Sequence, residues 1–306
     1  MSIPDWLDDD PSPDYFYRLG NFIEDVREQG REKAEKVLGY QGPKLYGPLD
    51  LMALADEDVE MYFPTGFPAF DRVFRGIPNG RVTVVAAATS HGKTAFAIEM
   101  ALRVARRQDG YVIYVSAELG PREMAHRIKQ RGESLTADDL IVVSNDKAPT
   151  TKSMRGVIEH IRDTRDKPPS MLIFDYLDYS GEKVDNKIMR LEQAAAGCHE
   201  IAGDFWMPVI IVQQLNREME KEHRAPYLTD LSWCDFPRKA ASMVLMLQQR
   251  YVQAVNTSRE VEVPEEWDLM VYVRKNTHGR IGDMQFQMDL PTGRIWDNSE
   301  SAILNS

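Results

Sequence analysis

Cysteine is scarce in this sequence of 306 residues, where only Cys198 and Cys234 occur. The two lie far apart and lack the close spacing of metal ligands, so the sequence argues against both a disulfide framework and a zinc site. This usage suits a reducing compartment. We expect both side chains to be buried, unreactive thiols.

Long apolar runs are absent as well, and none reaches the length that spans a membrane. The first residues, MSIPDWLDDDPSP, are acidic and contain proline, whereas an export signal would be basic and then apolar. We therefore expect a soluble, unexported protein without a membrane partner.

An excess of basic residues is also missing, since the formal net charge is −11 at pH 7. A nucleic-acid site would therefore have to be a local basic patch or a loop. The hydrophobic content of 43% is enough for the core of one large α/β domain with a modest appendage.

Three segments can be distinguished along the chain. DYFYRLGNFIEDVREQGREKAEKVLG has apolar residues at helical spacing and predicts an N-terminal helical extension within residues 1–48. After a glycine- and proline-rich stretch, LDLMALADEDVE predicts a linker helix over 49–60. From about residue 61 to 300, short apolar strands alternate with helical patterns, which predicts an α/β fold with a mostly parallel central sheet flanked by helices.

A phosphate-binding loop is the clearest motif. RVTVVAA predicts a buried strand, ATSHGK a loop and TAFAIEMALRVARRQ a helix, with Ala87 where the G-x-x-x-x-G-K-[ST] pattern has its first glycine. In this order, backbone N–H groups can surround phosphate oxygens, Lys93 can reach the β and γ phosphates, and the Thr94 hydroxyl can hold Mg²⁺. A chance GKT at a helix start is the alternative, and the flanking strand and helix argue against it. The expected nucleotide-binding residues are Ser90, His91, Gly92, Lys93, Thr94 and Ala95.

Three polar residues follow later apolar strands. Glu118 follows YVIYVS, Asp175 ends SMLIFD and Gln214 ends VIIVQQ. Ligands bind at the carboxyl ends of strands in open α/β sheets, so these side chains can complete the site with a base, a Mg²⁺ ligand and a sensor of the γ phosphate. Each residue on its own could instead have a structural role, as a helix cap, a turn residue or a strand end. An ATP site explains the three residues together better.

The ordered motifs are similar to those of the DnaB-like ring helicases of bacteria and phages, over about residues 49–298. The segments that carry this resemblance are FPTGFPAFDRVFRGIPNGRVTVVAA, ATSHGKTAFA, VSAELGPREMAHRIKQR, LIFDYLDY and RLEQAAAGCHEIAGDFWMPVIIVQQLNR. The resemblance implies a RecA-like P-loop NTPase fold, with Glu118 as general base, Asp175 on Mg²⁺ and Gln214 as sensor. It also implies ATP and Mg²⁺ as cofactors and single-stranded DNA as a partner. Further implications are a ring that is a hexamer, a primase or helicase loader as partner, and a cytoplasmic location in a bacterial or phage-infected cell.

The strand LMVYVRKNTHGRIG departs from the family pattern, in which a lysine and, two positions later, an arginine reach the neighbouring subunit's ATP site. Lys275 matches the lysine, but Thr277 stands at the arginine position. Because side chains alternate along a strand, we expect Arg274 to point to the opposite face. Arg280, beyond a glycine, is the better substitute for the missing arginine finger.

Two basic segments are candidate DNA contacts. LTDLSWCDFPRKAASMVLML replaces the family's glycine- and serine-containing loop with a bulky one, and LNREMEKEHRAPY precedes it. Basic and aromatic loop residues can hold single-stranded DNA through phosphates and stacking, whereas a solvated loop with interleaved glutamates is the alternative. The expected contacts are Arg217, Lys221, Arg224, Arg238 and Lys239.

Three functions stay open at this point. The first is an ATP-dependent ring helicase of DNA replication that translocates on single-stranded DNA. The second is a helicase-derived loader, adaptor or regulator with weak hydrolysis, favoured by Thr277, by the altered loop and by an N-terminal part too short for a helical or primase domain. The third is a RecA-like recombinase or clock-type ATPase, against which the helicase-like segments argue.

Overall fold

The computed structural model describes residues 60–107, 110–116, 118–132, 140–144, 149–175, 186–215, 224–231, 239–250 and 266–297. All of them belong to one compact unit, Glu60–Ser306. The expected extension over 1–48 and all but the last residue of the expected linker helix over 49–60 lie outside the described residues, so their boundaries stay predictions. Within the described part, no helix is both long and apolar enough to cross a membrane.

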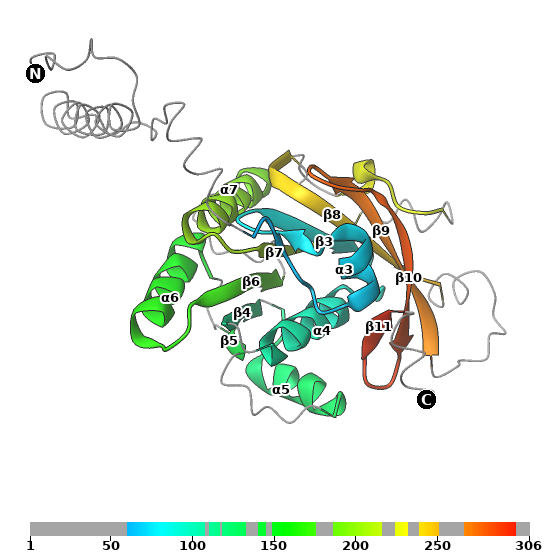
Figure 1. Ribbon diagram of the computed structural model, residues 1–306, viewed down its shortest axis with the longest axis horizontal. Helices are drawn as coiled ribbons and strands as arrows, with labels where there is room; N and C mark the ends of the chain where they lie inside the picture. The colour runs from blue at the N-terminus through cyan, green and yellow to red at the C-terminus, as the bar shows by residue number, and fades with distance from the viewer. Residues whose placement is uncertain are drawn as a thin grey trace, which may run out of the picture. The chain divides into compact units, whose positions relative to one another are not determined.

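A nine-stranded sheet forms the centre of the domain, in the order β11-β10-β9-β8-β3-β7-β6-β4-β5 (Figure 1). The strands that pair in parallel are β3 (Val82–Ala87), β4 (Tyr111–Ser116), β5 (Leu140–Ser144), β6 (Pro169–Asp175), β7 (Val209–Gln214) and β8 (Ala241–Gln249). The antiparallel strands at one side are β9 (Glu266–Asn276), β10 (Gly282–Asp289) and β11 (Ile295–Asp297). The predicted mostly parallel α/β sheet is confirmed.

The helices fall into two groups. The first group consists of α3 (Pro68–Phe74), α4 (Lys93–Arg106) and α5 (Pro121–Gln130), and the second of α6 (Thr151–Thr164) and α7 (Lys187–Phe205). Smaller elements are the hairpin of β1 (Tyr62–Phe63) with β2 (Ile77–Pro78) and the 3-10 turn η3 (Leu228–Asp230). In Figure 1, α4 and α5 lie on one side of the sheet and α6 and α7 on the other.

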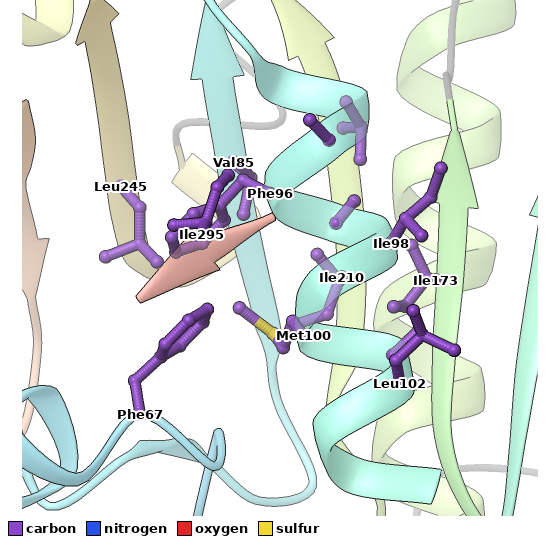
Figure 2. Close-up of a cluster of buried hydrophobic side chains, with 14 of the residues drawn as sticks. Phe67, Val85, Phe96, Ile98, Met100, Leu102, Ile173, Ile210, Leu245 and Ile295 are labelled. Carbon is purple, nitrogen blue, oxygen red and sulfur yellow. The ribbon is translucent and has the colours of Figure 1, made fainter. Parts of the chain in front are cut away.

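The central parallel strands are buried on both faces, which explains why they are continuous apolar runs instead of alternating ones. All six residues of β3 and all six of β4 are buried. Odd and even positions of these strands contribute to two separate cores. One core packs against α3, α4 and α5, and the other packs against α6 and α7. Figure 2 shows the first core, where Phe96 and Met100 of α4 lie between the strands and Phe67.

A buried ionic cluster joins four segments on the α4 side. The Glu99 carboxylate lies 3.0 Å from Nε of Arg103 and 3.6 Å from Nε of Arg131. Arg103 also donates to the carbonyl groups of Gly66 and Ile295, and Arg131 donates to that of Gly293. The cluster therefore holds α4, the end of α5, the segment before α3 and the β10–β11 hairpin together.

Candidate nucleotide-binding site

The loop between β3 and α4 has the backbone of an anion-binding turn. Ser90 and Gly92 adopt left-handed conformations with φ of 68° and 82°. Gly92 is the residue before α4, and a Cβ there would come within 3.3 Å of the Met288 sulfur. Since the first turn of a helix leaves its N–H groups without intrahelical partners, the amides of residues 93–95 are donors for phosphate oxygens.

The helix α4 begins at Lys93, one residue before the predicted start at Thr94. Both residues lie near Asp175 at the end of β6, since the Lys93 charge and the Thr94 hydroxyl each lower the pKa of its carboxyl group. Burial outweighs these effects and raises that pKa above its ordinary value. An ammonium, a hydroxyl and a carboxyl group therefore come together at the carboxyl edge of the sheet.

Asp175 has one carboxylate oxygen occupied and one without a partner. Its side chain is fully buried, and the Tyr114 hydroxyl donates to Oδ2 at 2.6 Å. Oδ1 is buried and has no hydrogen-bond partner among the described residues. A buried carboxylate oxygen beside a threonine hydroxyl fits Mg²⁺, which prefers oxygen ligands and takes most of them from phosphates and water. The described residues contain no cluster of three or more His, Cys, Asp or Glu side chains that could hold a metal ion.

Glu118 lies two residues beyond β4, next to Asp175. Ser116, the last residue of β4, is paired in register with Asp175. The Ser116 hydroxyl donates to the Leu119 carbonyl and accepts from the Leu119 N–H group, which closes a turn around Glu118. The Glu118 side chain is exposed, and its charge raises the pKa of Asp175. This placement leaves the carboxylate open to a water molecule.

Gln214 is the last residue of β7 and is paired in register with Ala87, the last residue of β3. Its side-chain amide donates to the Thr89 hydroxyl in the loop at 2.8 Å. The predicted sensor amide therefore lies against the phosphate-binding loop itself.

His91 is a polar residue of the loop whose side chain is buried. Nδ1 accepts a hydrogen bond of 2.9 Å from the backbone N–H group of Gln249, the last residue of β8. Burial lowers the pKa of His91 to about 4, so the ring is neutral at pH 7. The imidazole therefore anchors the loop to the sheet, a role that the sequence pattern does not indicate.

Three residues lie near the amino ends of the parallel strands, on the side opposite to the phosphate-binding loop. They are Lys275, Thr277 and Arg280. Asn276 pairs with Met243, and Met243 pairs with Thr83 near the start of β3. With about 3.3 Å per residue, roughly 13 Å of strand separates this level from Ala87. These three candidates therefore cannot share the ATP site of their own chain.

Two of these residues contact backbone carbonyl groups near the start of β8. Lys275 Nζ donates to the Lys239 carbonyl at 3.4 Å, and the Thr277 hydroxyl donates to the Ser242 carbonyl at 3.1 Å. Arg280 is exposed in the turn before β10, and its carbonyl accepts from the Asn276 side chain.

The expected orientation of Arg274 is wrong because a β-bulge interrupts the alternation. Val244 pairs with Lys275 and Leu245 with Val273, so Arg274 is an extra residue in β9. Paired residues share a face, and Val244 belongs to the core on the α6 and α7 side. Lys275 therefore lies on that face, as does Arg274, which stacks on Tyr272 of the same core.

The predicted DNA contacts divide into two groups. Arg217, Lys221 and Arg238 lie outside the described residues. Lys239 is exposed, whereas Arg224 makes a bidentate ion pair with the buried Asp230, at 2.6 and 2.8 Å. Arg224 thus has a structural role, and its contact with DNA stays a prediction.

Comparisons with known proteins identify similar helicases. The sequence model of the family described as "DnaB-like helicase C terminal domain" matches residues 63–141 and 130–295. A "Probable plasmid replicative DNA helicase" of Chlamydia psittaci is 23% identical over 78% of this chain and 56% of its own. The "Replicative DNA helicase DnaB" of Leifsonia xyli is 24% identical over 89% of this chain and 66% of its own. The chain thus spans between about half and two thirds of the length of these two curated relatives.

Solved structures support the fold. The structure of a DnaB-like replicative helicase, described with its interactions with primase, superposes with a TM-score of 0.68 at 18% identity, covering 92% of this chain and 74% of that one. This likeness bears out the RecA-like architecture expected from the motifs. Because the family match extends over most of the chain, this protein belongs to the DnaB-like helicase C terminal domain family.

Proposed function

We propose that this protein is an ATP-dependent DNA helicase motor of the ring type, which translocates on single-stranded DNA during replication. The observation that carries the proposal is the convergence of Lys93, Thr94, Asp175, Glu118 and Gln214 at one edge of the sheet. Phosphates, a divalent cation and an attacking water each have a group of the right chemistry there.

Each side chain has a definite task in this proposal. The amides at the start of α4 and the Lys93 ammonium bind the phosphates, while Thr94 and Asp175 would hold Mg²⁺. The cation would neutralise charge on the transferred phosphoryl group. Glu118, exposed beside the metal ligands, accepts a proton from the attacking water as general base. Gln214, at the loop, senses the γ phosphate.

The position of Lys275 in β9 and of Arg280 in the turn after it supports assembly into a ring. Lys275 and Arg280 lie near the amino ends of the parallel strands, and the phosphate-binding loop lies at the carboxyl ends. They can therefore complete an ATP site only if this side of a second copy faces the loop. A head-to-tail contact of this kind closes into a ring when its rotation allows. We propose that the ring is a hexamer and that Arg280 replaces the arginine missing at Thr277.

The remaining partners follow from the same proposal. The segments that contain Arg217, Lys221, Arg238 and Lys239 would bind the phosphates of single-stranded DNA. A primase or a helicase loader would dock on the assembled ring, and the site of action would be the cytoplasm of a bacterial or phage-infected cell.

The second candidate function is a helicase-derived loader, adaptor or regulator that binds ATP but hydrolyses it slowly. Thr277 favours it, because an arginine finger contributes roughly 10³–10⁵ in rate where it has been measured in other NTPases. The two candidates differ in turnover.

Steady-state ATP hydrolysis, with and without single-stranded DNA, tests the proposal. We expect DNA to stimulate turnover, Lys93→Ala to abolish nucleotide binding, and Glu118→Gln to keep binding while slowing hydrolysis by about 10²–10⁴. Binding without turnover in the wild type would favour the second candidate. Nucleotide binding that survives Lys93→Ala would contradict both.

A further inference from the structure

Tyr114 links two strands at the candidate metal site. It lies on β4 opposite Ile173 of β6, and both side chains belong to the core on the α4 side. Asp175 is two residues beyond Ile173 on the same strand and therefore on the same face. The fully buried tyrosine ring reaches along this face, and its hydroxyl donates to Oδ2 of Asp175 at 2.6 Å.

This hydrogen bond restricts the orientation of the carboxylate. The χ2 torsion of aspartate has broad minima, so an unsupported carboxylate samples many orientations. With Oδ2 bound to Tyr114, the other oxygen is held in one orientation, in a carboxyl group that also interacts with Thr94 and Lys93. Oδ1 is also one of several buried side-chain atoms without a hydrogen-bond partner in the described part of the chain.

Tyr114 can only act as a donor here. Burial and the neighbouring Asp175 raise its pKa well above its ordinary value, so it keeps its proton at neutral pH. The hydrogen bond therefore satisfies Oδ2 of Asp175, whereas Oδ1 has no hydrogen-bond partner among the described residues.

We propose that Tyr114 is a positioning residue of the nucleotide site, which fixes the Asp175 carboxylate so that Oδ1 is presented to the Mg²⁺ of a metal–nucleotide complex. The proposal rests on the proposed function. Partners that orient metal ligands affect metal affinity by about 10- to 100-fold when they are removed. Tyr114 has this relation to Asp175 without touching nucleotide or metal.

The test compares nucleotide binding with and without metal. The affinity of the full-length protein for a fluorescent ATP analogue is measured in Mg²⁺ and in EDTA, and the ratio of the two dissociation constants gives the metal-dependent gain. We expect Tyr114→Phe to reduce this gain by roughly 10-fold while binding in EDTA stays within about twofold. Asp175→Asn should remove the gain, and the double variant should lose nothing further.

Tyr111 provides a matched control on the same strand. Its hydroxyl donates to Oδ1 of Asp166 at 2.7 Å, at the end of β4 remote from the site. Tyr111→Phe removes the same kind of hydrogen bond and should leave the metal-dependent gain unchanged. Thermal unfolding of both variants monitors any loss of stability.

The outcomes separate this inference from the proposed function. A normal metal-dependent gain in Tyr114→Phe, an equal loss in Mg²⁺ and EDTA, or a wild type without any metal-dependent gain would overturn the positioning role alone. A wild type that binds no nucleotide in either condition would overturn the proposed function and the positioning role with it.

Discussion

At the scale of single residues, hydrogen bonds between the phosphate-binding loop and the neighbouring strands hold the loop in place. Thr89 accepts from Gln214 at the end of β7, and His91 accepts from Gln249 at the end of β8. These two strands flank β3 in the sheet. The loop is therefore fixed on both sides before a nucleotide arrives, which lowers the entropic cost of binding.

The pH dependence of stability tests the His91 anchor. Its pKa is about 4 in the folded protein and 6.5 in its ordinary environment, so the unfolded chain binds the proton more readily between these values. Stability from this residue is present above pH 6.5 and is lost as the pH falls towards 4. The 2.5-unit difference in pKa corresponds to about 3 kcal/mol.

Two variants isolate this contribution. His91→Asn keeps an acceptor at the position of Nδ1 but does not titrate, whereas His91→Leu has a similar branched shape without an acceptor. Chemical denaturation at pH 7 and pH 4 should show a loss in the wild type about 3 kcal/mol larger than in His91→Asn. At pH 7, His91→Leu should be less stable than His91→Asn; equal stabilities would contradict the anchor.

At the scale of elements, the ionic cluster around Glu99 decides how α4 meets the β10–β11 hairpin. Glu99 and Arg103 are four residues apart on α4 and are both almost fully buried, with side-chain exposures of 2% and 11%. Glu123 and Arg127 have the same spacing on α5, but their side chains are 51% and 38% exposed. The two pairs allow a comparison at constant helix geometry.

Neutralising the two glutamates should therefore have unequal effects. Glu99→Gln removes the negative charge that lies between two arginines in the buried cluster, and we expect it to lower the free energy of unfolding by about 3–5 kcal/mol. Glu123→Gln should cost less than about 1 kcal/mol because water screens the exposed pair. Urea denaturation measures both. Similar losses in the two variants would show that the buried cluster does not join the elements as described.

At the scale of the whole molecule, the carboxyl ends and the amino ends of the parallel strands have different proposed roles. The candidate nucleotide residues lie at the carboxyl ends of β3, β4, β6 and β7. Lys275 and Arg280 lie near the amino ends of the parallel strands. In the proposed function, a complete catalytic site then requires two copies of the chain.

Mixing of variant subunits tests this arrangement. Lys93→Ala removes the phosphate contact and Arg280→Ala removes the proposed finger, so each variant alone should hydrolyse ATP poorly. In co-expressed, co-purified assemblies, some interfaces join an intact Lys93 from one subunit to an intact Arg280 from the next. We expect these mixed assemblies to regain hydrolysis.

Two results would contradict the shared site. One is normal hydrolysis by Arg280→Ala alone, which would show that this arginine is not the finger. The other is the absence of any recovery in mixed assemblies, although each variant assembles as the wild type does in light scattering. Thr277→Arg is a complementary test, because it restores the family's arginine at an exposed position and should raise the rate of ATP hydrolysis.

Local patterns in the sequence were enough to predict the alternation of strands and helices from residue 61 and to select the residues of the candidate nucleotide site. Strand, loop and helix around Lys93 are local in the chain, and apolar runs that end in Asp175 or Gln214 identify strands with polar ends. Parallel pairing brings such ends to one edge regardless of side-chain detail. Most of the candidate site was therefore predictable from local patterns.

Only the tertiary structure decided the contacts between strands that are distant in the sequence. The hydrogen bond from Tyr114 to Asp175 and the one from Gln249 to His91 depend on register and on side-chain reach, which no local pattern specifies. The bulge at Arg274 reversed the expected orientation, because one extra residue shifts the face of everything that precedes or follows it. Local sequence thus selects the elements, whereas packing determines which side chains meet.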